Sequence, residues 1–339
     1  MQCNVVPLNP ANRLGLNYRA EAAHLPWPSW ITDGHVHLSG VEAVRRYFEV
    51  AAWFGVKNAW SQTQLEEVDA LQRAFPGRIE FVAVPNYAAR DQADTFTTDW
   101  LRRIEAFRAR GARIAKFWAA PRGLDFHESF KLDHPTRRRA IKLAYSLGMA
   151  IMVHVGDPDT WFATKYRDAA KYGTKMEQYR PLEALLDQYP DRPLLAAHMA
   201  GHPEDLEHLQ RLLDRYPNLH LDTSATKWMV RELSKNPGSL RAFLQRNPGR
   251  VIFGTDLVVN SNDDPATAHD LYASRFWALR TLLETDYHGP SPIVDPDLSM
   301  VDPSLPAQST ATLHGCAADA ATLGAVYQSA AAGFLAKLK

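Results

Sequence analysis

Two histidines stand two positions apart in the stretch DGHVH, which occupies residues 33–37. A short apolar run precedes this stretch, and that setting favours a β-strand. Side chains at positions i and i+2 of a strand face the same side, so His35 and His37 are expected to point in one direction. Neutral imidazole is the commonest protein ligand for zinc-like ions, and two imidazoles supply half of a four-coordinate site. The stretch therefore indicates half of a metal site, whose other ligands must come from elsewhere in the chain.

Further polar residues fall at or just after later apolar runs, and these are Lys116, His154, His198, Asp222 and Asp256. Each has an ordinary explanation when it is taken alone: a hydrogen-bonded core histidine, an outward-pointing lysine, or an aspartate that organises a turn. Buried histidine and aspartate side chains must nevertheless be paired, hydrogen-bonded or bound to a metal. Because all of these residues recur at the ends of predicted strands, one bound cation explains them more simply than separate structural roles.

Short apolar strands alternate with amphipathic helices from residue 31 to residue 283. The predicted strands cover residues 31–37, 56–60, 79–84, 113–117, 150–155, 193–198, 219–222 and 251–255. Eight such units predict an α/β protein of the (β/α)8 TIM-barrel class, in which chemistry lies at the carboxyl ends of the strands. A doubly wound sheet shows the same alternation, but no G-x-G-x-x-G motif follows the first strand.

The barrel is predicted to occupy residues 30–287, after an irregular N-terminal arm at residues 1–29. Residues 288–316 are rich in Pro, Asp and Ser and are predicted to form a surface loop. Residues 317–339 are predicted to form an Ala-rich helix that packs on the outside of the barrel. A long aromatic and charged insertion at residues 156–179 is a candidate interface for a homo-oligomer.

The composition is that of an ordinary globular enzyme, with 46% hydrophobic and 22% charged residues. Lys plus Arg and Asp plus Glu both number 38 in 339 residues, which indicates neither nucleic acid nor a membrane surface as partner. Two cysteines, Cys3 and Cys316, cannot build a disulfide framework and favour a reducing, cytoplasmic setting. No apolar run has signal-peptide or transmembrane character, so we expect a soluble protein that acts on a small molecule.

The motifs resemble those of the amidohydrolase superfamily, and most closely its amidohydrolase-related branch of metal-dependent hydrolases and aromatic-acid decarboxylases. The matching stretches are DGHVH at 33–37, Lys116, VHVG at 153–156, AHMAG at 197–201 and FGTD at 253–256. The resemblance implies a distorted TIM barrel with a divalent ion, most often zinc, while manganese or iron suits the same donors. The metal ligands that it implies are His35, His37, His154 and Asp256. It also implies that His198 faces the bound water or the substrate, or ligates a second metal.

Two roles are open for Lys116. In binuclear relatives a lysine at this place is carbamylated and bridges two metals, whereas an unmodified ammonium would bind an anionic substrate. The second role is favoured here, and with it one ion in preference to two. The family's usual Asn-Ala pair near the C-terminus is missing from residues 326–330, which indicates an outlying subgroup.

Three further residues are candidates for substrate binding. Lys227 and Arg231 are spaced i, i+4, so on a helix they share a face and would clamp a carboxylate. The same spacing is also typical of a solvated basic face. Trp161, in the insertion, either lines the pocket or buries that long loop.

The predicted function is metal-dependent hydrolysis of an amide, ester or lactone-type bond in a small carboxylated substrate. Asp256 would take a proton from water and pass it to the leaving group, while His198 would polarise the substrate carbonyl. The alternative is a non-oxidative decarboxylase of an aromatic or unsaturated acid, which would use the same metal ligands. A third interpretation is a binding or scaffold protein that keeps the metal site without turnover.

Overall fold

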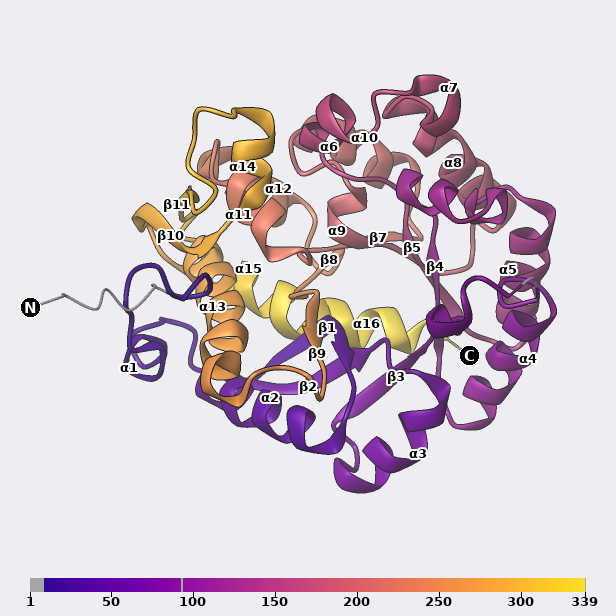
Figure 1. The fold of residues 1–339 in the computed structure, drawn as a ribbon, viewed down its shortest axis with the longest axis horizontal. Coiled ribbons are helices and arrows are strands. Elements are labelled where there is room, and N and C mark those ends of the chain that lie inside the picture. The colour runs from indigo at the N-terminus through magenta and orange to yellow at the C-terminus, as the bar shows by residue number, and fades with distance from the viewer. Residues whose placement is uncertain (1–8, 93, 339) are drawn as a thin grey trace, which may run out of the picture.

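The computed structural model describes residues 9–92 and 94–338 of the chain. Within these residues the dominant element is one sheet of nine strands, which helices surround (Figure 1). Its strands are β1 (Ile31–Leu38), β2 (Val56–Ser61), β3 (Ile79–Ala83), β4 (Ile114–Trp118), β5 (Ala150–His154), β6 (Leu194–Ala196), β7 (Leu219–Asp222), β8 (Val251–Ile252) and β9 (Leu257–Val259). Neighbours in the order β8-β7-β6-β5-β4-β3-β2-β1-β9 all run parallel.

The predicted eighth strand, residues 251–255, stops early as β8 at Ile252, and a further strand, β9, follows it. The two pair with opposite edges of the sheet. β8 pairs with β7, and β9 pairs with β1. Between them, Gly34 N donates to Phe253 O at 2.7 Å and Asp256 N donates to His35 O at 2.8 Å. The sheet is thus closed into a barrel, and the predicted TIM-barrel class is confirmed. The break in the strand was not predicted, and it arises because Asp256 has a φ of 56°, which a continuous strand does not allow.

The connections between consecutive strands carry the helices that cover the barrel. The main ones are α2 (Val41–Trp53), α3 (Leu65–Ala74), α4 (Thr98–Ala109), α5 (Pro135–Ser146), α8 (Tyr179–Gln188), α10 (Leu206–Arg215), α12 (Pro237–Arg246) and α13 (Pro265–Glu284). In α10, Leu209 and Leu213 lie four positions apart and are both buried, and the Asp205 side chain accepts a hydrogen bond from His208 N at 2.8 Å. An apolar stripe and an N-cap thus define this helix, as the sequence indicates.

The C-terminal segment closes the end of the barrel that lies opposite the carboxyl ends of the strands. It consists of α15 (Ala320–Gly324), η5 (Ala325–Ser329) and α16 (Ala330–Ala336), which cross behind the strands in Figure 1. The ring of Phe334 packs against Trp60 with centroids 5.6 Å apart, and Gln328 Nε2 donates to the carbonyl of Trp30 just before β1. The predicted helix thus packs across this end of the barrel, and its Phe334 side chain joins the core inside it, which was not predicted.

Replacing Phe334 with leucine is expected to lower the free energy of unfolding by about 1–2 kcal/mol, because apolar contacts inside the barrel are lost and only partly replaced. Urea unfolding measures this loss. Ala332→Ser, at an exposed position of the same helix, serves as the control and is expected to change stability by less than about 0.5 kcal/mol. Equal stabilities of the two variants would mean that α16 does not close the barrel.

Two regions that the sequence predicts as irregular contain regular structure. Residues 288–316 hold an antiparallel pair, β10 (His288–Val294) and β11 (Thr310–His314), with α14 (Pro296–Val301) between them. The predicted surface loop is wrong there, because prolines are tolerated in a strand whose outer edge needs no N–H donors. The N-terminal arm contains α1 (Tyr18–Ala22), while residues 1–8, with Cys3, lie outside the described residues.

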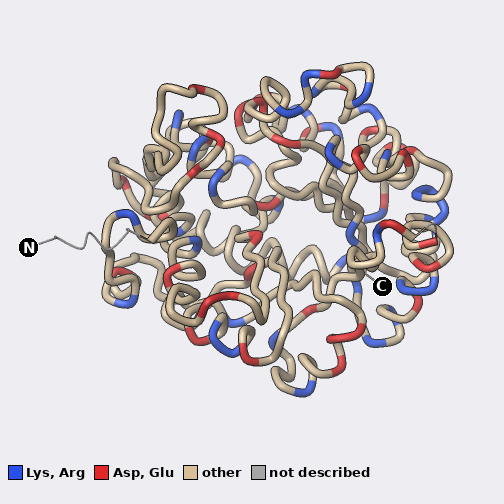
Figure 2. The backbone as a smooth tube through the Cα atoms, viewed as in Figure 1, with Lys and Arg blue, Asp and Glu red and all other residues tan. Residues whose placement is uncertain are grey.

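The insertion after β5 folds into three short helical pieces, α6 (Asp159–Thr164), α7 (Ala169–Tyr172) and η4 (Met176–Gln178). Basic and acidic residues are intermingled around the barrel (Figure 2). Among the described residues, no helix combines the length and the apolar character that crossing a membrane requires.

Candidate metal centre

Strand β1 is held against the eighth strand by Asp33, whose side chain is fully buried. Its carboxylate accepts hydrogen bonds from Thr255 Oγ1 at 2.7 Å, from Thr255 N at 3.0 Å and from Tyr47 OH at 2.9 Å. Burial raises the pKa of Asp33 to about 7 although these donors oppose the shift. The next residue must be glycine, because a Cβ on Gly34 would lie 2.5 Å from Ile252. Asp33 and Gly34 thus fix the histidines that follow beside Asp256.

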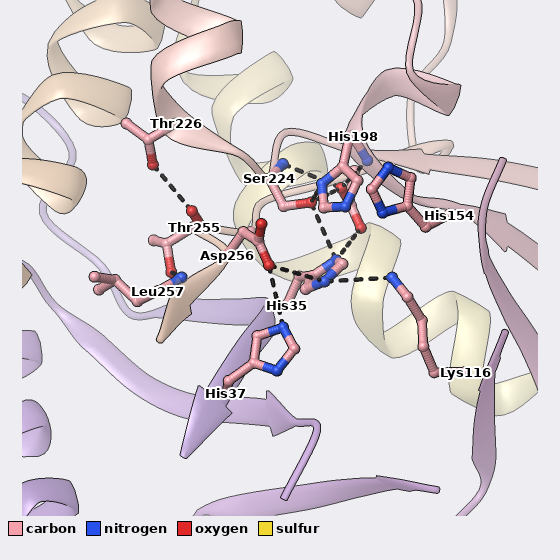
Figure 3. Close-up of polar contacts among 12 residues, drawn as sticks. His35, His37, Lys116, His154, His198, Ser224, Thr226, Thr255, Asp256 and Leu257 are labelled. Carbon is pink, nitrogen blue, oxygen red and sulfur yellow. Dashed lines mark hydrogen bonds and ion pairs between the residues drawn. The ribbon is translucent and has the colours of Figure 1, made fainter. Parts of the chain in front are cut away.

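His35, His37 and Asp256 converge at the carboxyl end of the barrel (Figure 3). Asp256 Oδ1 lies 3.4 Å from His35 Nε2 and 3.3 Å from His37 Nε2. Burial disfavours the charged carboxylate of Asp256, but its hydrogen bond with His37 and the nearby His35 outweigh this and hold its pKa well below the usual range. The strand spacing therefore brings both imidazoles to one ionised carboxylate.

Asp222, at the end of β7, orients His35 from behind. Its Oδ2 accepts a hydrogen bond from His35 Nδ1 at 2.9 Å, so that Nε2 keeps a free lone pair toward Asp256. Its Oδ1 accepts bonds from His198 N at 2.7 Å and from the hydroxyl of Ser224. Burial raises the cost of the Asp222 charge, yet His35 and these donors hold its pKa well below the usual range. The sequence placed Asp222 among the strand-end residues around a cation, with loop organisation as the alternative, and it did not predict the contacts of Ser224.

His198 lies in a left-handed turn and not at the end of a strand. β6 stops at Ala196, and His198, Met199 and Ala200 have φ values of 59°, 50° and 53°. The predicted strand to residue 198 is therefore wrong at its end, because the chain turns sharply there. The next residue, Gly201, abuts the preceding loop so closely that a Cβ would lie 2.0 Å from Gly156 O. This turn brings the ring of His198 into the barrel mouth, 4.8 Å from that of His35.

The protonation of His198 follows from its surroundings. Burial, together with nearby His154, His35 and Lys116, holds its pKa well below the usual range, so the ring is neutral. Ser224 Oγ gives its hydrogen to Asp222 and therefore accepts one from His198 Nδ1, 2.7 Å away. A neutral ring with its proton on Nδ1 has a lone pair on Nε2.

His154 lies in the same mouth, with its ring centroid 4.4 Å from that of His198. Its Nε2 is hydrogen-bonded to Asp157 Oδ1 at 2.9 Å, and Asp157 Oδ2 accepts a bond from Tyr166 OH at 2.5 Å. Its ligand role stays a prediction, because the groups of possible ligands found among the described residues do not include it. The contacts of Asp157 and Tyr166 were missed, although Asp157 stands only three positions after His154.

Lys116 reaches the centre from β4, and its Nζ lies 3.4 Å from His35 Nε2 (Figure 3). Its side chain is buried, and no described carboxylate lies within ion-pair distance of it. Burial lowers the pKa of Lys116 to about 8, although Asp222 and Asp256 oppose the shift. The lysine therefore lies beside the predicted ligands without a direct ion pair to a described carboxylate.

The centre opens into a cavity of about 620 Å³. Its walls are largely aromatic, and the rings come from Tyr87, Trp118, Phe126, Phe130, Trp161 and Trp228. Arg90 and Arg122 also line it, and neither forms an ion pair with a described carboxylate. Trp161 thus lies at the cavity, as the sequence suggested. The two arginines were missed because they stand in loops that have no strand or helix periodicity.

The predicted carboxylate clamp of Lys227 and Arg231 does not form. Both residues lie on α11 (Thr226–Leu233), but Arg231 is buried and its Nη1 lies 2.5 Å from Asp295 and 3.3 Å from Asp297. Because these carboxylates already neutralise Arg231, the proposed clamp is wrong for this residue. Lys227 instead lines a smaller neighbouring cavity of about 340 Å³.

The donors of His35, His37 and Asp256 suit a divalent ion. Two imidazole nitrogens and one carboxylate oxygen lie within 4.8 Å of one another. Metal-binding histidines usually give their second N–H to a carboxylate, as His35 does to Asp222. A separate group of Asp159, His202 and Glu204 is less suited, because Lys175 Nζ lies 3.2 Å and 3.7 Å from its two carboxylates.

Comparison with known proteins agrees with this architecture. A family model described as amidohydrolase matches residues 33–284. An uncharacterized TIM-barrel protein from Bordetella bronchiseptica is 13% identical over 91% of this chain and 99% of its own, with a TM-score of 0.52, which supports the fold. A probable 2-pyrone-4,6-dicarboxylic acid hydrolase from Acinetobacter baumannii is 11% identical over 74% of this chain and 91% of its own, with a TM-score of 0.47. A 2,6-dihydroxybenzoate decarboxylase from Rhizobium is 12% identical over 74% of this chain and 99% of its own, with a TM-score of 0.42. No curated protein matches the sequence.

Proposed function

The chain belongs to the amidohydrolase family, and on that premise we propose that it is a metal-dependent hydrolase of an amide, ester or lactone-type bond in a small carboxylated substrate. The observation that carries the proposal is the position of Asp256. Its carboxylate lies within 3.4 Å of two histidine nitrogens, and 29% of its side chain is exposed to the cavity. A group in this position serves both as a ligand and as a base.

His35, His37 and Asp256 would hold the metal, and His154 is the further ligand that the family resemblance implies. A divalent cation, when bound, acts as a Lewis acid that makes water more acidic and polarises a carbonyl group. Zinc is the ion that we propose, although these donors also suit manganese or iron.

In the proposed reaction, Asp256 takes the proton of the attacking water and delivers it to the leaving group. The low pKa of this carboxylate keeps it ionised at neutral pH, so it would carry no proton of its own when the water gives one up. His198 was expected to polarise the carbonyl, but a hydrogen-bond donor at Nε2 is needed for that role. Because its proton lies on Nδ1, we propose that His198 instead accepts a hydrogen bond from the attacking water.

The cavity walls favour a small, flat substrate that carries at least one carboxylate. Aromatic rings such as those of Trp118 and Trp228 pack against flat apolar surfaces. Lys116, Arg90 and Arg122 supply positive charge without a described carboxylate partner, and guanidinium groups bind carboxylates through two parallel hydrogen bonds.

A second candidate is non-oxidative decarboxylation of an aromatic acid, and Lys116 is the observation that favours it. Its ammonium lies beside the predicted metal ligands, where it would bind the carboxylate that is lost. In that reaction the carbon–carbon bond to the carboxylate breaks, carbon dioxide leaves, and the ring carbon takes a proton. Because Asp256 is ionised, it would first accept this proton from solvent and then pass it to the ring carbon.

A substrate screen separates the two candidates. The protein, loaded with zinc or manganese, is incubated with lactones, esters, amides and hydroxybenzoates, and both acid release and carbon dioxide are recorded. Hydrolysis predicts acid release from a lactone, ester or amide without carbon dioxide. Carbon dioxide from a hydroxybenzoate, with no hydrolysis of the other compounds, would reject the hydrolase in favour of the decarboxylase.

A further inference from the structure

A second cavity of about 340 Å³ adjoins the catalytic cavity. The two cavities share Arg122, Trp161, Trp228 and Asp256 in their walls. Asp256 thus stands between them. A molecule whose reacting bond lies at Asp256 therefore has room to extend into the second cavity.

The carboxylates of this second cavity already have partners. Asp295 accepts a hydrogen bond from Arg231 at 2.5 Å, and Asp297 accepts one from Trp161 Nε1 at 2.8 Å. Asp256 is bound to the two histidines of the metal centre. These acidic groups are therefore engaged with other partners, and Asp295 and Asp297 act on Lys227 only from beyond ion-pair distance.

Three cations of the cavity, Arg122, Lys227 and Arg275, form no ion pair with a described carboxylate, and the last two lie on neighbouring helices. Lys227, on α11, forms no hydrogen bond or ion pair with any described residue. Arg275, on α13, donates only to the hydroxyl of its neighbour Ser274, at 2.8 Å. Both side chains are partly buried, and α11 packs against α13. Burial and then the nearby charge of Arg275 lower the pKa of Lys227, while the more weakly acting carboxylates of Asp295 and Asp297 oppose the shift.

Other cations in this region have internal partners, as is typical of cations with a structural role. Arg231 is surrounded by carboxylates, and Lys165 lies 3.8 Å from Asp297 and 3.2 Å above the ring of Trp161. Partly buried charges are costly unless they are paired. Lys227 and Arg275 lack internal pairing, so an anion from outside the protein is the natural partner.

We propose that Lys227 and Arg275 form an oxyanion subsite that binds a second anionic group of the substrate, either a carboxylate or a phosphate. The inference rests on the proposed function, because it takes the reacting bond to lie at Asp256. The substrate class is then a dianion, with one anionic group in the aromatic cavity and the other beyond Asp256. The guanidinium offers two parallel donors and the ammonium a point charge, a combination that suits either oxyanion.

Calorimetric titration of the metal-loaded protein tests the subsite without turnover. The probes are pentanoate as monoanion, glutarate and adipate as dicarboxylates of different reach, and 4-phosphonobutyrate. We expect the best dianion to bind about tenfold or more tightly than pentanoate. Lys227→Met and Arg275→Met should each weaken dianion binding about tenfold and leave pentanoate within about twofold. Preference for 4-phosphonobutyrate over both dicarboxylates would identify phosphate as the natural group, and the reverse would identify carboxylate.

Lys235→Met is the matched control, because it removes the same charge from an exposed residue just after α11 and should not change dianion binding. Equal affinities for dianions and pentanoate, or dianion binding that both variants leave unchanged, would overturn the subsite. Circular dichroism and thermal unfolding of the variants establish that they are folded.

Repeating the titrations in Asp256→Asn protein separates the two proposals. If this variant still turns over substrate while Lys227→Met abolishes dianion preference, the role of Asp256 fails and the subsite stands. If Asp256→Asn abolishes turnover but Lys227→Met and Arg275→Met leave the affinity for dianions unchanged, the subsite fails and the proposed function stands.

Discussion

Replacing Asp256 with asparagine is expected to lower turnover by about a thousandfold or more while the fold stays intact. The amide keeps the shape of the carboxylate, but it cannot accept the proton of water and is a poorer metal ligand. Asparagine also tolerates the left-handed backbone of residue 256, whose φ is 56°, better than most residues do. The measurement is kcat/KM for the substrate that the screen identifies, with thermal unfolding as the check on folding.

Asp264→Asn is a suitable control for this variant. Asp264 caps the start of α13, where asparagine serves equally well, so activity and stability should stay at the level of the unchanged protein. Turnover by Asp256→Asn within about tenfold of the unchanged protein would remove Asp256 as the base in the mechanism.

Replacing Asp222 with alanine is expected to lower the free energy of unfolding by about 3–5 kcal/mol. The fully buried carboxylate accepts bonds from His35, from His198 N and from Ser224, and all of these donors would be left unpaired. Metal affinity should also fall by about 10- to 100-fold, because His35 loses the partner that orients its ring. Guanidinium unfolding with a chelator present measures the first effect, and metal titration measures the second.

The two effects of Asp222→Ala are separable. Ser224→Ala removes the donor to Asp222 and the acceptor of His198 Nδ1, and should cost only about 1–3 kcal/mol, because Asp222 keeps its bonds to His35 and His198 N. An Asp222→Ala protein that binds metal as tightly as the unchanged protein would contradict the orienting role of Asp222.

The period of the apolar residues was enough to predict the barrel and the end at which its polar residues gather. Side chains two positions apart on a strand must share a face, so His35 and His37 were predictable as a pair. The break between β8 and β9 was not predictable, because it depends on the left-handed backbone at Asp256 and on hydrogen bonds to β1. Local sequence does not reveal either.

The errors at the site have a common physical origin in contacts between distant segments. Arg231 and Lys227 have the right spacing for a clamp, but Asp295, which lies 64 positions away from Arg231, neutralises its charge. The left-handed turn that begins at His198 ends at Gly201, which packs closely against Gly156 in a distant loop. Patterns along one segment cannot show such partners, whereas positions on a regular strand or helix follow from the segment alone.

The central claim is that His35, His37 and Asp256 hold a divalent ion, and its most direct test is the metal content of the purified protein. Elemental analysis after dialysis should find about one zinc-like ion per chain. His37→Ala should lose that ion, whereas His269→Ala, which changes a histidine that stacks on Trp53 outside the site, should retain it. Protein without any bound divalent ion after incubation with zinc, manganese or iron, or a His37→Ala variant that binds the ion as tightly as the unchanged protein, would contradict the claim.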